Sequence, residues 1–209
     1  MNSESELKYS LTAKEFKTLK KHLSSFAHDS KRQINHYFDS VNLNLKRKKI
    51  GLRIRITKKK APILTVKFPK PHKTPNLAAL KVRYEYEEPI SNQDAQRVLR
   101  GGKGIHDLKA TPVRILKQKV AQKYLDQLVK LGTLKNHRTT YKYTHGLILE
   151  LDQFTYFGKT FHELEIETSK PNQADLKIRE LFRNLKIKYR PEKQSKLARF
   201  LKEWKIKKA

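Results

Sequence analysis

The 209-residue chain contains no cysteine, and no stretch approaches the roughly 18 consecutive apolar residues that a membrane-spanning helix requires. The absence of cysteine excludes disulfides, thiol catalysis and cysteine-ligated zinc sites. The first residues also lack the apolar segment of a secretory signal. We therefore expect a cytoplasmic protein that does not enter a membrane.

Acidic residues are scarce, with 20 aspartates and glutamates against 48 lysines and arginines, which gives a formal net charge of +28. Such an excess predicts affinity for polyanions such as nucleic acid, polyphosphate, nucleotides or an anionic membrane surface. Hydrophobic residues make up 37% of the chain, and the length allows a substantial core. The composition therefore predicts a soluble, very polar protein with anionic partners.

Charged and apolar residues alternate at several places, which is the period of a β-strand with one polar and one apolar face. Arg83, Glu85 and Glu87, for example, alternate with Tyr84 and Tyr86. The same pattern predicts eight strands, near residues 3–10, 33–39, 50–58, 62–68, 80–88, 138–145, 146–153 and 161–168.

Helical periodicity occupies segments between and after these strands. Thr12 and Glu15 form a capping box in front of an apolar stripe. A second stripe from Val113 to Leu128 predicts a longer helix that Gly132 terminates. Two further stripes lie at 176–185 and 197–204.

The polar strand faces carry both signs of charge at a higher density than one solvent-facing sheet needs. Eight strands can close into a barrel whose interior holds side chains or one small ligand. We therefore predict an α+β fold, predominantly antiparallel β, in which a closed eight-stranded barrel turns its charged faces inward and helices pack on the outside. An open sheet with two layers is the alternative.

Short motifs follow one another from residue 4 to about residue 201. They are Glu4-x-Glu6-x-Lys8, His36–Asp39, Leu52–Arg55, Leu64–Lys67, Arg138, Asp152 before Tyr156–Gly158, Glu163–Glu167, Tyr189–Pro191, and Ser195–Lys196 with Arg199. In this order they resemble the CYTH superfamily, the triphosphate tunnel metalloenzymes, and especially its compact stand-alone bacterial members. The resemblance implies a single domain over residues 1–209, an eight-stranded antiparallel tunnel that binds a triphosphate and divalent metal ions.

The resemblance also implies a role for individual charged side chains. Seven would hold phosphates: Lys8, Arg53, Arg55, Lys67, Arg83, Arg138 and Lys196. Four would bind the main metal ion: Glu4, Glu6, Glu163 and Glu165. Three would be catalytic, by holding a second metal or orienting the attacking water: Glu85, Glu87 and Asp152. This mixture suits the chemistry, because Arg and Lys neutralise phosphate oxygens and Mg²⁺ or Mn²⁺ takes carboxylate oxygens as ligands.

We therefore expect a triphosphatase that uses Mg²⁺ or Mn²⁺ to hydrolyse a linear triphosphate. Inorganic tripolyphosphate is expected before thiamine or nucleoside triphosphates, because the sequence offers no obvious base-specific pocket. A class IV-type adenylate cyclase, which makes cyclic AMP from ATP, is the enzymatic alternative.

A non-catalytic protein that binds polyphosphate, nucleotide or RNA is a further alternative. The basic runs at 46–49 and 58–60 exceed what a tunnel needs and keep this reading open. The carboxylates argue against it, since a pure anion binder gains nothing from acidic groups beside its ligand. RNA is therefore a less favoured partner than a triphosphate or polyphosphate.

Overall fold

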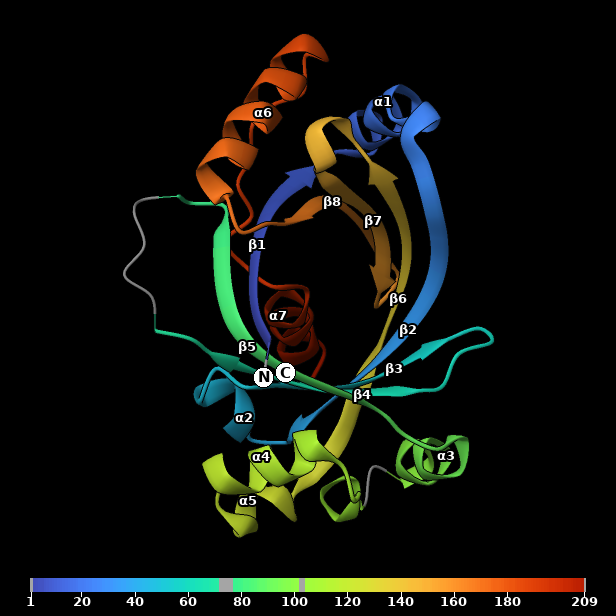
Figure 1. Ribbon diagram of the computed structural model, residues 1–209. Coiled ribbons are helices and arrows are strands. Elements are labelled where there is room, and N and C mark those ends of the chain that lie inside the picture. Colours follow the sequence, from blue (N-terminus) through green and yellow to red (C-terminus); the bar gives the residue numbers. More distant parts are fainter. Residues whose placement is uncertain (1, 72–76, 102–103, 209) are drawn as a thin grey trace.

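The computed structural model describes residues 2–71, 77–101 and 104–208 of the chain. In these residues, eight antiparallel strands close into a barrel in the order β1-β5-β4-β3-β2-β6-β7-β8 (Figure 1). The strands are β1 (Asn2–Leu11), β2 (Ala27–Ser40), β3 (Gly51–Thr57), β4 (Ile63–Pro69), β5 (Leu80–Pro89), β6 (Leu128–Lys142), β7 (Ile148–Tyr156) and β8 (Lys159–Glu167). The predicted closed barrel is confirmed, and the open-sheet alternative is wrong.

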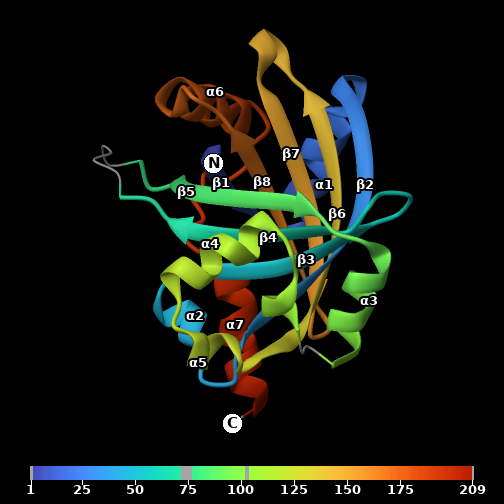
Figure 2. The same ribbon diagram turned by 60° about the horizontal axis from the view of Figure 1, so that its bottom comes forward.

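The same described residues form seven α-helices around the strands (Figures 1 and 2). They are α1 (Ala13–His22), α2 (Asn44–Arg47), α3 (Asn92–Gly101), α4 (Thr111–Lys119), α5 (Gln122–Leu125), α6 (Pro171–Asn184) and α7 (Lys196–Lys208). Short 3₁₀ turns occur at Ser24–Phe26, Ile105–Asp107 and Thr144–Gly146. Among the helices described, none combines the length and apolar character that would let it cross a membrane.

The strands alternate as the sequence predicts, with charged side chains inside the barrel and apolar side chains outside. In β8, Glu165 faces the interior, whereas Leu164 and Ile166 are fully buried on the outer side. These two residues belong to an apolar layer that includes residues of α1 and α6, and a second layer lies between β3, β4 and α3–α4. Because each fully buried aliphatic side chain contributes roughly 1.5–3 kcal/mol, the outer layers stabilise the barrel and leave its interior free for polar groups.

α7 differs from the other helices because it packs on inward-facing residues and closes one end of the barrel. Phe200 and Trp204 of α7 form one buried cluster with Tyr37 and Phe154. Phe154 lies two residues from Asp152, so both side chains lie on the same face of β7. The inner faces are therefore charged over most of the barrel and apolar only where α7 enters.

The predicted long helix that ends at Gly132 is wrong. α4 ends at Lys119, α5 ends at Leu125, and Gly132 lies inside β6. A Cβ atom at position 132 would lie 2.8 Å from Cζ of Phe200. Glycine at this position therefore permits the close approach of α7. From the sequence alone, a glycine required for packing cannot be distinguished from one that terminates a helix.

Two strands also begin earlier than their alternation predicts. β2 starts at Ala27 and β6 at Leu128, and the two pair along almost their whole length. Residues 27–30 are exposed, so no buried face imposes an apolar alternation there.

Residues 188–195, which we call the strap, connect α6 to α7 and run beside β1. The backbone N–H of Ser10 donates to the carbonyl of Arg190 (2.9 Å), and that of Glu192 donates to the carbonyl of Lys8 (2.8 Å). The strap thus continues the barrel wall beyond the start of β5 at Leu80. It delivers the chain to Lys196, the first residue of α7.

The strap is anchored from behind by one buried carboxylate. The hydroxyls of Tyr9 and Tyr189 each donate to Oδ1 of Asp175 at 2.6 Å, and Nε of Arg179 donates to Oδ2 at 2.7 Å. A buried acceptor with several donors fixes the geometry of its partners. This network therefore holds the strap against β1 and α6.

Candidate active site in the tunnel

The barrel encloses a cavity of about 160 Å³, which can hold a small anion with some water because one water occupies roughly 30 Å³ of liquid. Seven basic and six acidic side chains line it, together with polar residues and the first turn of α7. The basic set is Lys8, Arg53, Arg55, Lys67, Arg83, Arg138 and Lys196, and the acidic set is Glu4, Glu6, Glu85, Glu87, Glu165 and Glu167.

The structure places all the side chains proposed for the site at this cavity or directly behind it. Only Asp152 and Glu163 do not line the cavity, and both are completely buried. Period-2 alternation places the strand residues of this set on one face, whereas the choice of residues, and Lys196 of α7, came from the family resemblance.

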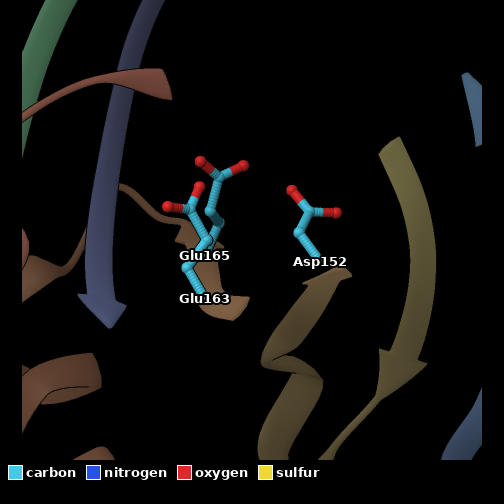
Figure 3. Close-up of side chains that lie close together, drawn as sticks. All are labelled: Asp152, Glu163 and Glu165. Carbon is cyan, nitrogen blue, oxygen red and sulfur yellow. The ribbon is translucent and has the colours of Figure 1, made fainter. Parts of the chain in front are cut away.

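Three carboxylates, Asp152, Glu163 and Glu165, form the most compact acidic group (Figure 3). One oxygen from each lies within 4.8 Å of the others. Lys196 contacts all three: its Nζ is 2.6 Å from Asp152 and 2.9 Å from Glu165, and it also pairs with Glu163. Despite its burial, Asp152 and Glu163 raise the pKa of Lys196, so the ammonium carries its charge at neutral pH.

Arg138 connects this acidic group to the rest of the tunnel. Its Nε and Nη2 donate to the two oxygens of Asp152 at 2.8 and 2.6 Å, which is the bidentate geometry typical of Arg–carboxylate pairs. Arg138 also pairs with Glu150 and Glu165. Although burial acts in the opposite direction, Arg138 and Lys196 lower the pKa of Asp152.

A second group of charges comes from the neighbouring strands β1, β5, β4 and β3. Lys67 Nζ lies 2.5 Å from Glu4 and 3.1 Å from Glu85. Arg53 Nη2 lies 3.4 Å from Glu85 and 3.3 Å from Glu87. Register explains the group, because Lys67 lies opposite Glu85 in the β4–β5 pair.

The two neighbouring glutamates of this group titrate in opposite directions. Burial, together with the nearby carboxylates of Glu4 and Glu87, raises the pKa of Glu85 to about 7. Burial opposes ionisation of Glu87 as well, but Arg53, the hydrogen bonds with Glu85 and Thr65, and Arg55 together outweigh it and lower the pKa of Glu87 to about 2. One of the pair is therefore able to hold or release a proton near neutral pH while the other stays ionised.

The structure groups the carboxylates differently from the sets that the sequence suggests. Asp152 lies with Glu163 and Glu165, whereas Glu4 lies with Glu85 across β1 and β5. Glu6 lies between these groups, with its carboxylate 3.1 Å from Lys8. β1 therefore contributes Glu4 to one acidic group and Lys8, which pairs with Glu165, to the other.

Some cations of the tunnel have no carboxylate partner among the described residues. Arg55 donates its Nε only to the amide oxygen of Asn35 (3.1 Å), and Arg83 lines the cavity without an ion pair in the described part of the chain. Burial, with Arg53 and Arg138 nearby, lowers the pKa of Arg55 to about 10, which still leaves it charged at neutral pH. These two guanidiniums provide unpaired positive charge for an anion.

Several residues of the site were not in the predicted set. Gln33, Asn35 and Asn136 line the cavity, and the amide of Asn136 donates to Asp152 at 3.1 Å. Asn136 shares its strand face with Arg138, so period-2 alternation was a usable signal for it. The same reasoning applies to Glu150, which lies two residues from Asp152 in β7 and therefore shares its strand face.

Residues at the start of α7 also belong to the site. Arg199 pairs with Glu163 and lies 3.4 Å from Glu192. Ser195 accepts the backbone N–H of Ala198 at 3.1 Å and so caps α7. The helical spacing between Lys196 and Arg199 brings both cations to the same carboxylate.

The donor set fits a hard divalent cation. Mg²⁺ and Mn²⁺ take oxygen ligands from carboxylates, phosphates and water, and Asp152, Glu163 and Glu165 supply carboxylate oxygens close together. A triphosphate brings about four negative charges. The negative charge of a triphosphate alone would exceed the net positive charge of a lining with seven basic and six acidic groups. Divalent cations bound with the triphosphate would offset the difference.

Comparison with known proteins agrees with this arrangement. Residues 2–201 match the protein-family model described as "CYTH domain". A protein of Bacillus subtilis (strain 168) named "Putative triphosphatase YjbK" is 30% identical over 200 residues, which cover 96% of this chain and 95% of that protein.

Two solved structures are similar over nearly their whole length. One, from Hippeastrum, is described as "Putative adenylyl cyclase HpAC1" with a dominant triphosphatase activity; it has a TM-score of 0.85 and 28% identity, and 96% of each chain is covered. The other, from Bacillus halodurans, is described as "a putative adenylate cyclase"; it has a TM-score of 0.76 and 27% identity, covering 96% of this chain and 99% of that one. The barrel, its helices and their connections are thus shared with these proteins.

Proposed function

Because this chain belongs to the CYTH domain family, we propose that it is a divalent-metal-dependent triphosphatase that hydrolyses a linear triphosphate, with inorganic tripolyphosphate as the preferred substrate. The observation that carries the proposal is the composition of the tunnel. It combines unpaired guanidiniums, which attract an anion, with dense carboxylates, which suit the metal ions that accompany a triphosphate. The triphosphatase names of relatives agree with it.

In this proposal water attacks the terminal phosphorus, and the basic residues bind the substrate and stabilise the departing pyrophosphate. Arg53, Arg55 and Arg83 contact phosphate oxygens from one side of the tunnel, and Lys8, Arg138 and Lys196 do so from the other. Because these groups are fixed before the reaction in a partly dehydrated cavity, they stabilise the charge that develops on the leaving oxygen without reorganising.

The acidic residues divide between metal binding and control of the attacking water. Glu163 and Glu165, with Glu6, which shares Lys8 with Glu165, would hold the main Mg²⁺ or Mn²⁺, and Asp152 would either join them or fix Arg138 and Lys196. Glu4, which the sequence assigned to the same ion, lies instead with Glu85. When bound, a divalent ion polarises phosphoryl oxygens and offsets their charge. Glu85, whose pKa lies near 7, is suited to accept a proton from water, with Glu87 beside it as a fixed negative charge.

The cavity lining favours an inorganic substrate over a nucleotide. Almost all lining residues are charged or polar; the exceptions are Tyr37, Gly51, Leu52 and Leu197. Of these, Tyr37 and Leu52 are almost fully buried. A purine ring needs an apolar surface to stack upon, and this lining supplies little. Cyclic AMP formation from ATP remains the second candidate, because two relatives carry adenylyl or adenylate cyclase names.

The proposal is tested by following the products from a panel of triphosphates. We expect purified protein with Mg²⁺ or Mn²⁺ to release phosphate from tripolyphosphate faster than from thiamine triphosphate or ATP. Pyrophosphate should accumulate as the second product, and EDTA should stop the reaction. Cyclic AMP and pyrophosphate from ATP, without phosphate release from tripolyphosphate, would establish the cyclase instead.

A binding role for the outer surface is the third candidate, and the charge distribution supports keeping it. The lining is nearly balanced, with seven basic and six acidic groups, so almost all of the net charge of +28 lies elsewhere. A surface of that charge binds RNA or long polyphosphate through counterion release. Substitutions inside the tunnel and on the outer surface separate such binding from occupation of the tunnel.

Arg55→Ala is expected to weaken tripolyphosphate turnover by about 10- to 100-fold, since a charge-assisted hydrogen bond contributes about 1.5–3 kcal/mol. Arg55 has no carboxylate partner in the described residues, so its removal deletes an anion contact without leaving a buried acid unpaired. The measurement is kcat/KM for phosphate release at fixed metal concentration.

The matched control is Lys58→Glu combined with Lys60→Glu in the exposed β3–β4 turn. This change removes more positive charge than Arg55→Ala, yet we expect turnover within about twofold of wild type, because these side chains do not line the cavity. Equal losses at both places would favour a diffuse polyanion-binding surface.

A further inference from the structure

Lys81 is the first inward-facing residue of β5 and lies at the junction of that strand with the strap. β5 keeps an uninterrupted register with β1, in which Lys81 lies opposite Glu6. Arg83 and Glu85, the next residues on the same face, line the cavity. The strap passes beside β1 where β5 begins (Figure 1). Lys81 therefore lies next to the residues that line the cavity, at the end of the tunnel where the strap passes.

The ammonium group of Lys81 is buried and has no hydrogen-bond partner in the described part of the chain. Four charged groups face it: Glu6 and Lys8 from β1, Glu163 from β8 and Glu192 from the strap.

Each nearby carboxylate is already paired with another cation. Glu6 lies 3.1 Å from Lys8, Glu163 pairs with Lys196 and Arg199, and Glu192 lies 3.4 Å from Arg199. Within the described residues, Lys81 therefore has no ion pair of its own.

A buried ammonium without a partner is costly, because it loses its hydration and gains no compensating contact. Burial, reinforced by Lys8, lowers the pKa of Lys81 to about 7. Methionine or leucine would fill the same space without this cost. A positively charged side chain at this position is consistent with an anionic partner that binds from the tunnel.

We propose that Lys81 is an additional substrate-binding residue, whose ammonium joins Lys8 in contacting the terminal phosphate group of the bound triphosphate on the side of the strap. The proposal rests on the triphosphatase function given above and adds one contact to it. A terminal phosphate offers more unshared oxygens and more charge than a bridging phosphate, so it is the part of the substrate best matched to two neighbouring ammonium groups.

Lys81→Met tests the assignment, because methionine keeps an unbranched apolar chain and removes the charge. With tripolyphosphate and Mg²⁺, we expect KM to rise about tenfold while kcat changes by less than about threefold. In EDTA, tripolyphosphate should raise the unfolding temperature of the variant less than that of wild type. A tenfold weaker affinity corresponds to about 1.4 kcal/mol less stabilisation by ligand.

The unfolding temperature without ligand distinguishes binding from a structural role. Removal of an unpaired buried charge should leave that temperature unchanged or raise it. A lower unfolding temperature combined with wild-type KM would overturn the assignment. Lys81→Arg, which keeps a charge, should recover part of the lost affinity, and exposed Lys60→Met should match wild type in both measurements.

The two proposals fail in different ways. If the wild-type protein releases no phosphate from any triphosphate, the proposed function is wrong. If wild type is active and Lys81→Met has the same KM and the same ligand-induced stabilisation, only the role of Lys81 is overturned.

Discussion

Glu6→Gln is expected to lower metal-dependent phosphate release by at least a hundredfold, the loss typical when one fixed electrostatic group of an active site is removed. The Glu6 carboxylate lines the cavity and is 7% exposed. An amide keeps its shape but offers a divalent cation no negative charge. Lys8 retains its pair with Glu165 in the variant, so we expect the barrel to stay folded.

The measurement is kcat over a range of Mg²⁺ and Mn²⁺ concentrations, alongside the unfolding temperature. Glu167→Gln is the matched control, because Glu167 lies opposite Glu6 in the β1–β8 register and also lines the cavity. Its side chain is exposed and lies outside the proposed metal set, so most of the activity should remain. Wild-type turnover in Glu6→Gln, or full wild-type activity in EDTA, would remove the metal from the proposed reaction.

The inner face of each strand was predictable because it depends only on the spacing of residues along that strand. Arg53 and Arg55 are two residues apart on a strand, and alternation alone puts both side chains on one side. The density of both signs of charge on these faces favoured a closed barrel over an open sheet, and the family resemblance implied the same tunnel. Closure itself depends on pairing between β1 and β8, for example of Glu6 with Glu167, and no local pattern encodes a contact between such distant parts of the chain.

The carboxylate grouping was less predictable because it depends on register and on a helix that enters the barrel. Asp152 lies beside Glu163 because β7 and β8 pair at those residues. Lys196 reaches both only because the strap turns α7 into one end of the barrel. In the sequence, α7 has the same amphipathic pattern as a helix that covers an outer face, and Gly132 gave no indication that it was the residue that admits Phe200.

Arg138→Met is expected to destabilise the fold more than any other single change considered for the tunnel. Arg138 pairs with Asp152, Glu150 and Glu165, and Glu150 has no other ion pair among the described residues. Removing one member of a buried ion pair costs about 3–5 kcal/mol, because the charge left behind, here that of Glu150, stays buried without compensation. For a chain of this length that corresponds to a fall of roughly 6–20 °C in the unfolding temperature.

The size of this loss should depend on pH in a defined direction. Burial already raises the pKa of Glu150 above its ordinary value, and Arg138 is the main group that opposes the rise. Without Arg138, the folded-state pKa increases further above the unfolded value. The destabilisation is then complete above that folded pKa and is relieved as pH falls, because the folded protein binds the proton first.

Wild type should show the opposite trend. The pKa values of Asp152 and Glu165 are lowered in the folded state, so their contribution to stability is present above about pH 4 and is lost as pH falls further. The difference in unfolding temperature between Arg138→Met and wild type should therefore be larger at pH 8 than at pH 5. Thermal unfolding of both proteins at the two pH values measures it directly.

Arg183→Met provides the matched control, since it makes the same chemical change at an exposed position of α6. We expect that variant to unfold within about 0.5 kcal/mol of wild type, as is usual for surface substitutions. The contrast with Lys81→Met is also informative. Both changes remove a cation whose charged group is buried, but only Arg138→Met leaves a carboxylate, Glu150, without an ion pair among the described residues. An Arg138→Met protein with wild-type stability at pH 8 would mean that Glu150 does not depend on Arg138 for its charge compensation, and the stabilising role given to this pair would be wrong.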